Sequence, residues 1–110
     1  PFGEAKPGAT GLEVLLPLTL KWAEAAGVAL PQALARITSA PAAVLGLPSG
    51  QLAVGAAADI CIFDPHAIWQ LTPEALLSRG KNSPWLGYMM TGKVKTTLVS
   101  GRVVFEEGAA

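Results

Sequence analysis

The 110-residue sequence has little charge, a single cysteine and no long apolar run. Eight basic and eight acidic side chains give a formal net charge of zero at pH 7. Because no basic stripe or tail is present, we expect no nucleic-acid partner. Pro, Gly, Lys and Glu interrupt each apolar stretch before it reaches the roughly 18 residues of a membrane span, so we expect no membrane partner. One cysteine cannot form an internal disulfide, which favours a cytoplasmic setting.

Apolar residues are nevertheless abundant, at 51% of the chain against 15% charged residues. This content is high for a short chain, which has a large surface relative to its volume. We interpret the surplus as apolar faces that a segment or chain outside these 110 residues covers. The sequence is therefore expected to be part of a larger protein.

The first half of the chain is predicted to be helical. Thr10 and Glu13 have the spacing of a capping box, with Thr10 as the N-cap of a helix that Gly27 ends. Apolar residues follow at helical spacing, and Pro17 is expected to kink this helix or to remove one of its hydrogen bonds. A second helix is predicted near Pro31.

A third helix is predicted over about residues 41–45, closed by Gly46, and the character of the chain changes after residue 50. The stretch "ADICIFDP" predicts a strand that is buried on both faces and ends at Asp64-Pro65. Residues 66–92 are predicted to be irregular, with one helical turn near residues 73–78.

The stretch "VKTTLVSGRVVF" predicts a β-hairpin that turns at Ser100-Gly101. Helices thus precede residue 50 and strands follow it. A few helices followed by a few strands rarely make a self-sufficient fold, which again indicates part of a larger protein.

The sequence holds no recognisable metal-binding motif. His66 is the only imidazole and Cys61 the only thiol, and HxH, HExxH and CxxC are all absent. We assign His66 an ordinary surface or turn role and Cys61 the role of a small apolar residue in a strand.

Two carboxylates, Asp59 and Asp64, bracket the predicted strand. They are candidates for a catalytic pair. The interpretation we favour is structural: Asp59 accepts from backbone donors where the strand begins, and Asp64 caps the turn before Pro65.

The opening loop is the best candidate for ligand binding. Pro7-Gly8 is followed by Gly11 and by the start of a helix. Glycine lets a backbone approach a ligand closely, and the N–H groups at a helix start favour an anion such as a carboxylate. Loops of this composition are common, so the spacing alone leaves the ligand role open.

Three stretches resemble one known family. The stretch "EAKPGATGLEVLLPLTL" is similar to the loop and helix near the end of the catalytic barrel in dihydroorotases, A-x-x-G-x-x-G-L-E-T, with Val14 in place of the usual Thr. The stretch "SAPAAVLGLPSGQLAVGAAADICIFDP" resembles cyclic amidohydrolases in general. The stretch "KNSPWLGYMMTGKVKTTLVSGRVVF" resembles their ending, which hydantoinases and allantoinases share.

The resemblance implies an α/β fold, the C-terminal part of a (β/α)₈ amidohydrolase barrel plus strands of a small β-sandwich. Residues 1–49 would form the end of the catalytic barrel, with the substrate loop and last helices. Residues 50–110 would form the C-terminal part of the sandwich with its connecting loop, and "NSPW" would tie the two together. The N-terminal remainder of the same protein would be the partner of this chain.

The resemblance also implies where the chemistry lies. The zinc ligands and the catalytic Asp of the family would all lie outside this chain, which therefore contributes no catalytic or metal-binding residue. Pro7 and Gly8 would line the small-molecule substrate through backbone contacts. This chain has Lys-Pro-Gly where many bacterial relatives have Pro-Phe-Gly, so the expectation concerns the backbone and not a side chain.

The implied function is that of a zinc-dependent dihydroorotase of pyrimidine biosynthesis, which cyclises N-carbamoyl-L-aspartate reversibly to dihydroorotate. One alternative is a non-catalytic dihydroorotase-like subunit that assembles with aspartate carbamoyltransferase. The other is a hydantoinase- or allantoinase-type cyclic amidohydrolase. A homo-oligomer is a further expected assembly.

Overall fold

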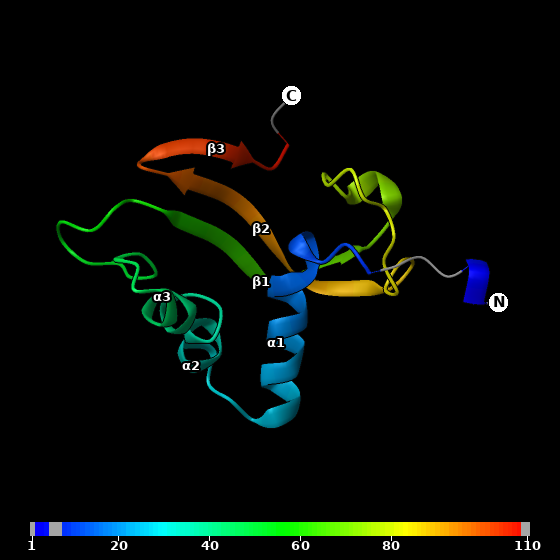
Figure 1. The fold of residues 1–110 in the computed structure, drawn as a ribbon, viewed down its shortest axis with the longest axis horizontal. Coiled ribbons are helices and arrows are strands. Elements are labelled where there is room, and N and C mark those ends of the chain that lie inside the picture. The colour runs from blue at the N-terminus through cyan, green and yellow to red at the C-terminus, as the bar shows by residue number, and fades with distance from the viewer. Residues whose placement is uncertain (1, 5–7, 109–110) are drawn as a thin grey trace.

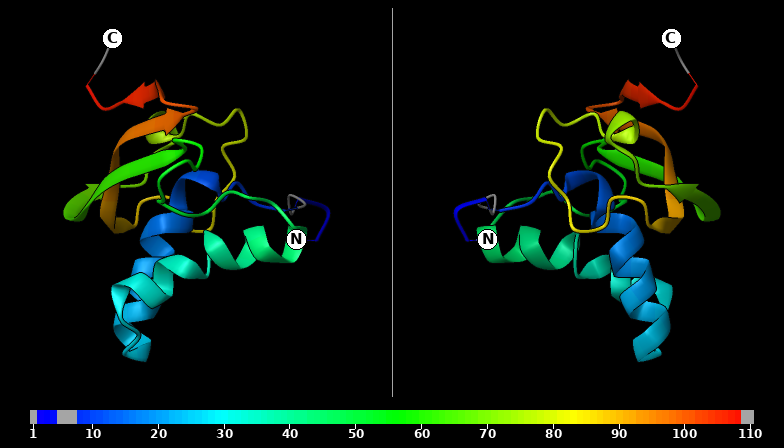
Figure 2. Two further views of the ribbon diagram at one scale, coloured as in Figure 1. Left: turned by 90° about the vertical axis from the view of Figure 1, so that its left-hand side faces the viewer. Right: turned by 90° about the vertical axis from the view of Figure 1, so that its right-hand side faces the viewer.

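The computed structural model describes residues 2–4 and 8–108. Three helices lie below one antiparallel sheet of three strands, as the views of Figures 1 and 2 agree. The helices are α1 (Leu15–Ala26), α2 (Leu30–Ala35) and α3 (Ser39–Leu45), the strands are β1 (Ile60–Gln70), β2 (Met89–Val99) and β3 (Arg102–Glu106), and the single 3-10 turns are η1 (Phe2–Glu4), η2 (Leu12–Val14) and η3 (Pro73–Ala75).

The start of the first helix differs from the prediction. The turn η2 precedes α1, and neither element has a side-chain cap, so the predicted capping box of Thr10 is wrong. Pro17 lies in the first turn of α1, where backbone N–H groups have no partner within the helix. Its missing N–H therefore costs no hydrogen bond, and the helix continues through it to Ala26.

The predicted ends of the helices are confirmed. Gly27 and Gly46 follow α1 and α3 in the left-handed conformation, at φ 69° and 68°. The Val28 N–H donates to Ala23 O over 2.9 Å, and the Leu47 N–H donates to Ala42 O over 2.8 Å. These bonds satisfy carbonyl groups that the helix itself leaves open.

The predicted hairpin is also confirmed. In the strand order β1-β2-β3, β2 pairs with both neighbours in antiparallel register. Val99 pairs with Arg102 across Ser100 and Gly101, whose φ angles are 51° and 78°. Two successive positive φ angles are what a two-residue turn of the right twist requires.

The first strand runs farther than predicted. β1 continues through Pro65 to Gln70, so the prediction that Asp64-Pro65 ends it is wrong. The register shifts between Asp64 and Ile68, and pairing resumes at Ile68 with Thr91. Because proline has no N–H to donate, it is tolerated in a strand at such an irregularity. Part of the stretch predicted to be irregular is therefore strand, whereas the predicted turn near residue 73 is present as η3.

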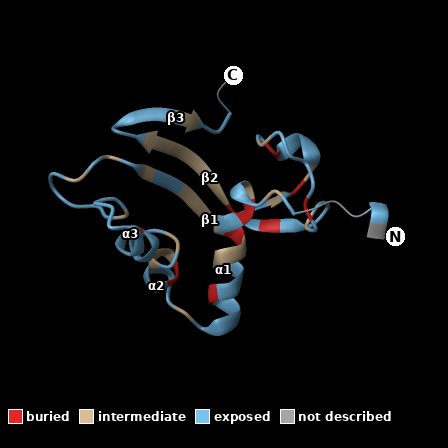
Figure 3. Cartoon of the chain, viewed as in Figure 1, coloured by how far each residue is buried: buried red, intermediate tan, exposed pale blue. Residues whose placement is uncertain are grey.

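The sheet is not buried on both faces within this chain. Cys61 is exposed, and Ile62 keeps 52% of its surface accessible. The prediction of a doubly buried strand is therefore wrong for these residues taken alone. Figure 3 shows buried residues at the lower end of the sheet, in the helices and in the segment between β1 and β2, whereas the upper strands are exposed or half-buried.

The main apolar core lies where the opening segment meets the sheet. Four buried side chains form it, and three partly buried ones pack against them: Val14, Leu71, Leu76 and Met90, with Leu18, Trp69 and Trp85. Helices before residue 50 and strands after it thus share one core, while their assignment to two domains stays a prediction. The core holds η2, which follows the opening loop, against β1 and β2.

A close approach between α1 and β2 adds to this contact. A Cβ atom on Gly92 would lie 2.6 Å from Leu20 Cδ1, so a side chain at this position would require the end of the Leu20 side chain to move. The Trp69 indole N–H donates to Gly92 O over 2.8 Å, so it holds β1 and β2 together beside this contact.

Candidate functional site

Gly8 is the described residue of the opening loop at which a ligand contact was predicted. This residue is exposed and left-handed, at φ 78°, and an added Cβ would meet no described atom within 4 Å. Pro7 lies outside the described residues. Substrate contact at either position therefore stays a prediction.

The loop is held from the other side by the stretch that precedes β2. The Asn82 side-chain amide donates to Gly8 O over 2.6 Å, and the Thr10 N–H donates to Asn82 O over 2.7 Å. A Cβ on Gly80 would lie 2.6 Å from Thr10 Oγ1, so the two segments are in direct contact. Sequence reasoning expected "NSPW" to tie two parts of the fold together, but it did not single out Asn82.

Glu13 lies in the same contact and serves a different purpose from the one predicted. Its Oε1 accepts from the Ser78 N–H over 3.1 Å and from the Ser78 hydroxyl. Its Oε2 is buried and has no hydrogen-bond partner among the described residues. The partner is 65 residues away in sequence, and no local pattern indicates it. Glu13 therefore anchors the loop, and it does not cap the helix.

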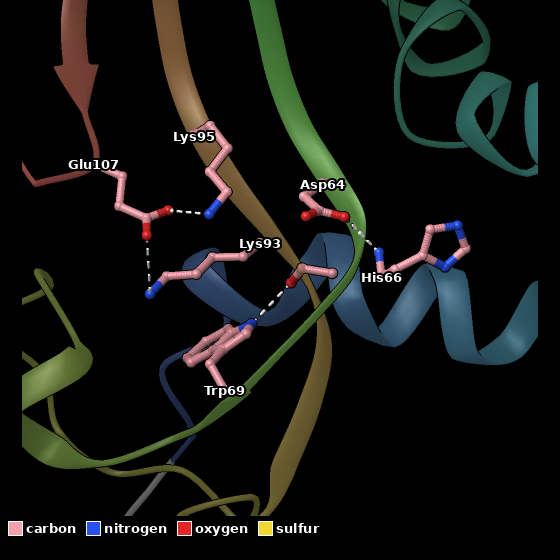
Figure 4. A network of polar contacts seen from close by, with 7 residues as sticks. Asp64, His66, Trp69, Lys93, Lys95 and Glu107 are labelled. Atoms are coloured by element: carbon pink, nitrogen blue, oxygen red, sulfur yellow. Dashed lines mark hydrogen bonds and ion pairs between the residues drawn. The ribbon is translucent and has the colours of Figure 1, made fainter.

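The two aspartates of β1 have separate structural roles. Asp59 Oδ1 accepts from the Ser100 N–H over 2.8 Å, which confirms the predicted role at the start of the strand. Asp64 Oδ1 accepts from the His66 N–H over 2.8 Å, as Figure 4 shows, within the irregularity around Pro65. Five residues of extended chain, roughly 16 Å, separate the carboxylates. They cannot act as a catalytic pair.

Neither the Cys61 thiol nor the potential metal ligands among the described residues form a further candidate site. Cys61 is exposed on the surface, but the neighbouring atoms partly shield its thiol from water, and this burial raises the pKa of the thiol. A raised pKa disfavours the reactive thiolate. Within residues 2–4 and 8–108, His, Cys, Asp and Glu form no group of three that could hold a metal ion. The described side chains thus do not fit a zinc site.

A groove of about 480 Å³ lies between α1 and the bent part of the sheet. Lys21 and Glu24 line it from α1, His66 lines it from β1, and Met89 lines it from the start of β2, with Tyr88 directly before that strand. Sequence reasoning missed this groove because the wall formed by α1 and the wall formed by the sheet come from segments more than 40 residues apart.

No helix in the described part of the chain is both long enough and apolar enough to span a membrane.

An ion-pair cluster lies on the sheet away from the opening loop. Glu107 is 3.0 Å from Lys95 Nζ and 3.7 Å from Lys93 Nζ (Figure 4). The hydrogen bond from Lys95 lowers the pKa of the Glu107 carboxyl below its ordinary value of 4.5. A lowered pKa in the folded state means that the pairing stabilises the protein above pH 4.5, and that this stabilisation is lost as the pH falls through the lowered pKa.

We expect Glu107→Gln to lower the free energy of unfolding slightly at pH 7 and to have no effect at strongly acidic pH. The pairs are exposed, so added salt should shrink the difference at pH 7. Denaturant titrations of wild type and variant from pH 7 down to pH 3 measure this. Glu106→Gln is the matched control, because the described ion pairs of this region involve Glu107. A wild-type advantage that grows below pH 4.5 would contradict the expectation.

The comparison with known protein families identifies the family of this chain. The model of the amidohydrolase family matches residues 22–105. The chain belongs to the amidohydrolase family. Within it, this amidohydrolase chain is 43% identical over 106 residues to a dihydroorotase-like protein of Pseudomonas aeruginosa, with 96% of this chain and 25% of that protein covered.

A dihydroorotase of Trichlorobacter lovleyi is also similar, at 43% identity over 104 residues, with 94% of this amidohydrolase and 24% of that protein covered. Among solved structures, the L-hydantoinase (dihydropyrimidinase) of Arthrobacter aurescens superposes with a TM-score of 0.86 at 31% identity. That superposition covers 99% of this chain and 25% of the other. This amidohydrolase chain therefore spans about a quarter of the length of the relatives it matches. The expected resemblance to dihydroorotases is confirmed, and the α/β elements match part of an amidohydrolase domain.

Proposed function

We propose that these 110 residues are the C-terminal portion of a dihydroorotase, which cyclises N-carbamoyl-L-aspartate to dihydroorotate. The observation that carries the proposal is the likeness to proteins named dihydroorotase, at 43% identity, against 31% for the L-hydantoinase structure. The motif Gly8, Gly11, Leu12, Glu13 agrees with it, because this is the part of the resemblance that points to dihydroorotases in particular.

In this proposal the chain binds and orients substrate and leaves bond making to residues elsewhere. Zinc, held by residues outside this chain, would polarise the amide carbonyl and lower the pKa of a bound water. The exposed backbone at Gly8 would lie along the substrate, as its open surroundings and left-handed φ allow. Asn82 and Glu13 hold this loop in place from behind.

Two other functions have specific support. The second candidate is a non-catalytic dihydroorotase-like subunit that assembles with aspartate carbamoyltransferase, and the relatives named dihydroorotase-like protein, at 43% and 45% identity, agree with the dihydroorotase-like part of it. The third candidate is a cyclic amidohydrolase that opens another ring, such as hydantoin or allantoin, and the similarity to hydantoinase structures supports it.

One assay of the complete protein separates the three functions. The protein is purified, its zinc content is measured, and turnover is followed with dihydroorotate, hydantoin and allantoin. Zinc and ring opening of dihydroorotate support the first function. Turnover of hydantoin or allantoin alone supports the third. A protein without zinc and without turnover refutes both, and co-purification with aspartate carbamoyltransferase then supports the second.

A further inference from the structure

The stretch of residues 78–82 holds the opening loop through Asn82. The Asn82 side-chain amide donates to Gly8 O over 2.6 Å, and its main-chain carbonyl accepts from the Thr10 N–H over 2.7 Å. One residue thus binds the loop at two points, on either side of Ala9. A pair of bonds to alternate residues fixes both the position and the direction of the backbone between them.

The loop also lies close to this stretch at Gly80. A Cβ on Gly80 would come within 2.6 Å of Thr10 Oγ1. Ser78 adds a third attachment, because its N–H and hydroxyl both donate to Glu13 Oε1. Bonds from residues 78 and 82 therefore attach the chain at Gly8, Thr10 and Glu13.

The stretch itself is fixed to the core, so it can set the position of the loop. The Lys81 ammonium donates to Leu76 O over 2.5 Å, and Leu76 belongs to the buried core. Ser83 is buried, and its hydroxyl accepts from the N–H of Trp85, which packs on the same core. Asn82 lies between these two anchored points.

We propose that Asn82 is a positioning residue for substrate binding, acting through the backbone of Gly8. This inference rests on the proposed function, in which the loop borders the substrate. The hydrogen bond at Gly8 O orients the peptide planes around Gly8. Without it the left-handed glycine samples other conformations, because glycine has wide conformational freedom. The loop would then pay an ordering cost when substrate binds, which weakens binding and leaves the chemical step intact.

The test compares Asn82→Ala and Asn82→Asp in the complete protein. We expect KM for dihydroorotate to rise roughly 3- to 10-fold in Asn82→Ala, as loss of one hydrogen bond predicts, with kcat within about twofold of wild type. Asn82→Asp keeps the shape but places an acceptor against Gly8 O, so its KM should rise further. Hydrogen exchange of residues 8–12 should accelerate in both variants.

Gln70→Ala is the matched control. Its side-chain amide also donates to a glycine carbonyl, Gly87 O, over 3.1 Å, and its described side-chain hydrogen bond does not go to the opening loop. The control should keep the wild-type KM and loop exchange, even if it loses a similar amount of thermal stability. Unchanged KM and exchange in Asn82→Asp, or an equal loss of kcat in all three variants, would overturn the proposal.

The experiment distinguishes failure of the proposed function from failure of the role proposed for Asn82. Wild-type protein that turns over no cyclic amide refutes the proposed function and with it the role in substrate binding. Normal turnover with unchanged variants refutes the role of Asn82 alone. If Asn82→Ala does not fold, the isosteric Asn82→Asp decides the outcome.

Discussion

Gly8→Val is expected to raise KM severely or to abolish turnover in the complete protein, with only a modest loss of stability. The residue has φ 78°, where a branched side chain is strained by about 1–2 kcal/mol. An added Cβ meets no described atom within 4 Å, so little packing is disturbed. The side chain would instead project into the space that the substrate is proposed to occupy. Steady-state kinetics and thermal unfolding of the same preparations measure the two effects.

Gly55→Val is the matched control for this variant. Gly55 has φ 87°, and it too has no atom within 4 Å of an added Cβ, but it lies in the stretch between α3 and β1. Its valine variant should lose a comparable amount of stability and keep wild-type kinetics. If Gly8→Val also keeps wild-type kinetics, Gly8 does not border the substrate.

Leu71→Ala should cause the largest loss of stability, about 2–5 kcal/mol in the free energy of unfolding. Leu71 is fully buried, at 0% exposure, among Val14, Leu76 and Met90. Its main chain is also held, because its N–H donates to Tyr88 O over 2.9 Å and its carbonyl accepts from the Gly87 N–H over 2.7 Å. The surrounding backbone therefore cannot collapse easily into the cavity that alanine leaves.

Leu71→Met is the control, because it conserves volume and apolar character and should cost less than about 1.5 kcal/mol. Urea denaturation of the complete protein, followed by circular dichroism and Trp fluorescence, compares the variants. Equal stability of Leu71→Ala and wild type would show that this cluster does not contribute to the fold. Since Val14 belongs to η2, which directly follows the opening loop, Leu71→Ala should also accelerate hydrogen exchange in residues 8–14.

Several local features could be predicted from the sequence because neighbouring residues decide them. Gly27 and Gly46 end helices, since glycine adopts the left-handed conformation at little cost. Gly101 adopts the same conformation for the same reason in the hairpin turn, next to Ser100, which also has a positive φ. Asp59 accepts from a backbone donor at the strand start, as a short carboxylate commonly does.

Other predictions failed because a distant contact outweighed a local preference. The spacing of Thr10 and Glu13 predicted a capping box, but Ser78 binds the Glu13 carboxylate. Proline predicted the end of β1 at residue 64, but pairing with Thr91 resumes it at Ile68 beyond an irregularity. A tertiary hydrogen bond or a strand pairing competes directly with the local alternative and contributes as much free energy.

The sequence by itself determined the family of this chain, the ends of its helices and the turn of its hairpin. These properties depend on residue types at short spacing and on backbone conformations that few residues tolerate. Only the tertiary structure decided which groups hold the opening loop, because Gly8 and Asn82 are 74 residues apart. Contacts of that separation depend on how η2, α1 and the first two strands pack around Leu71, and no local pattern encodes them.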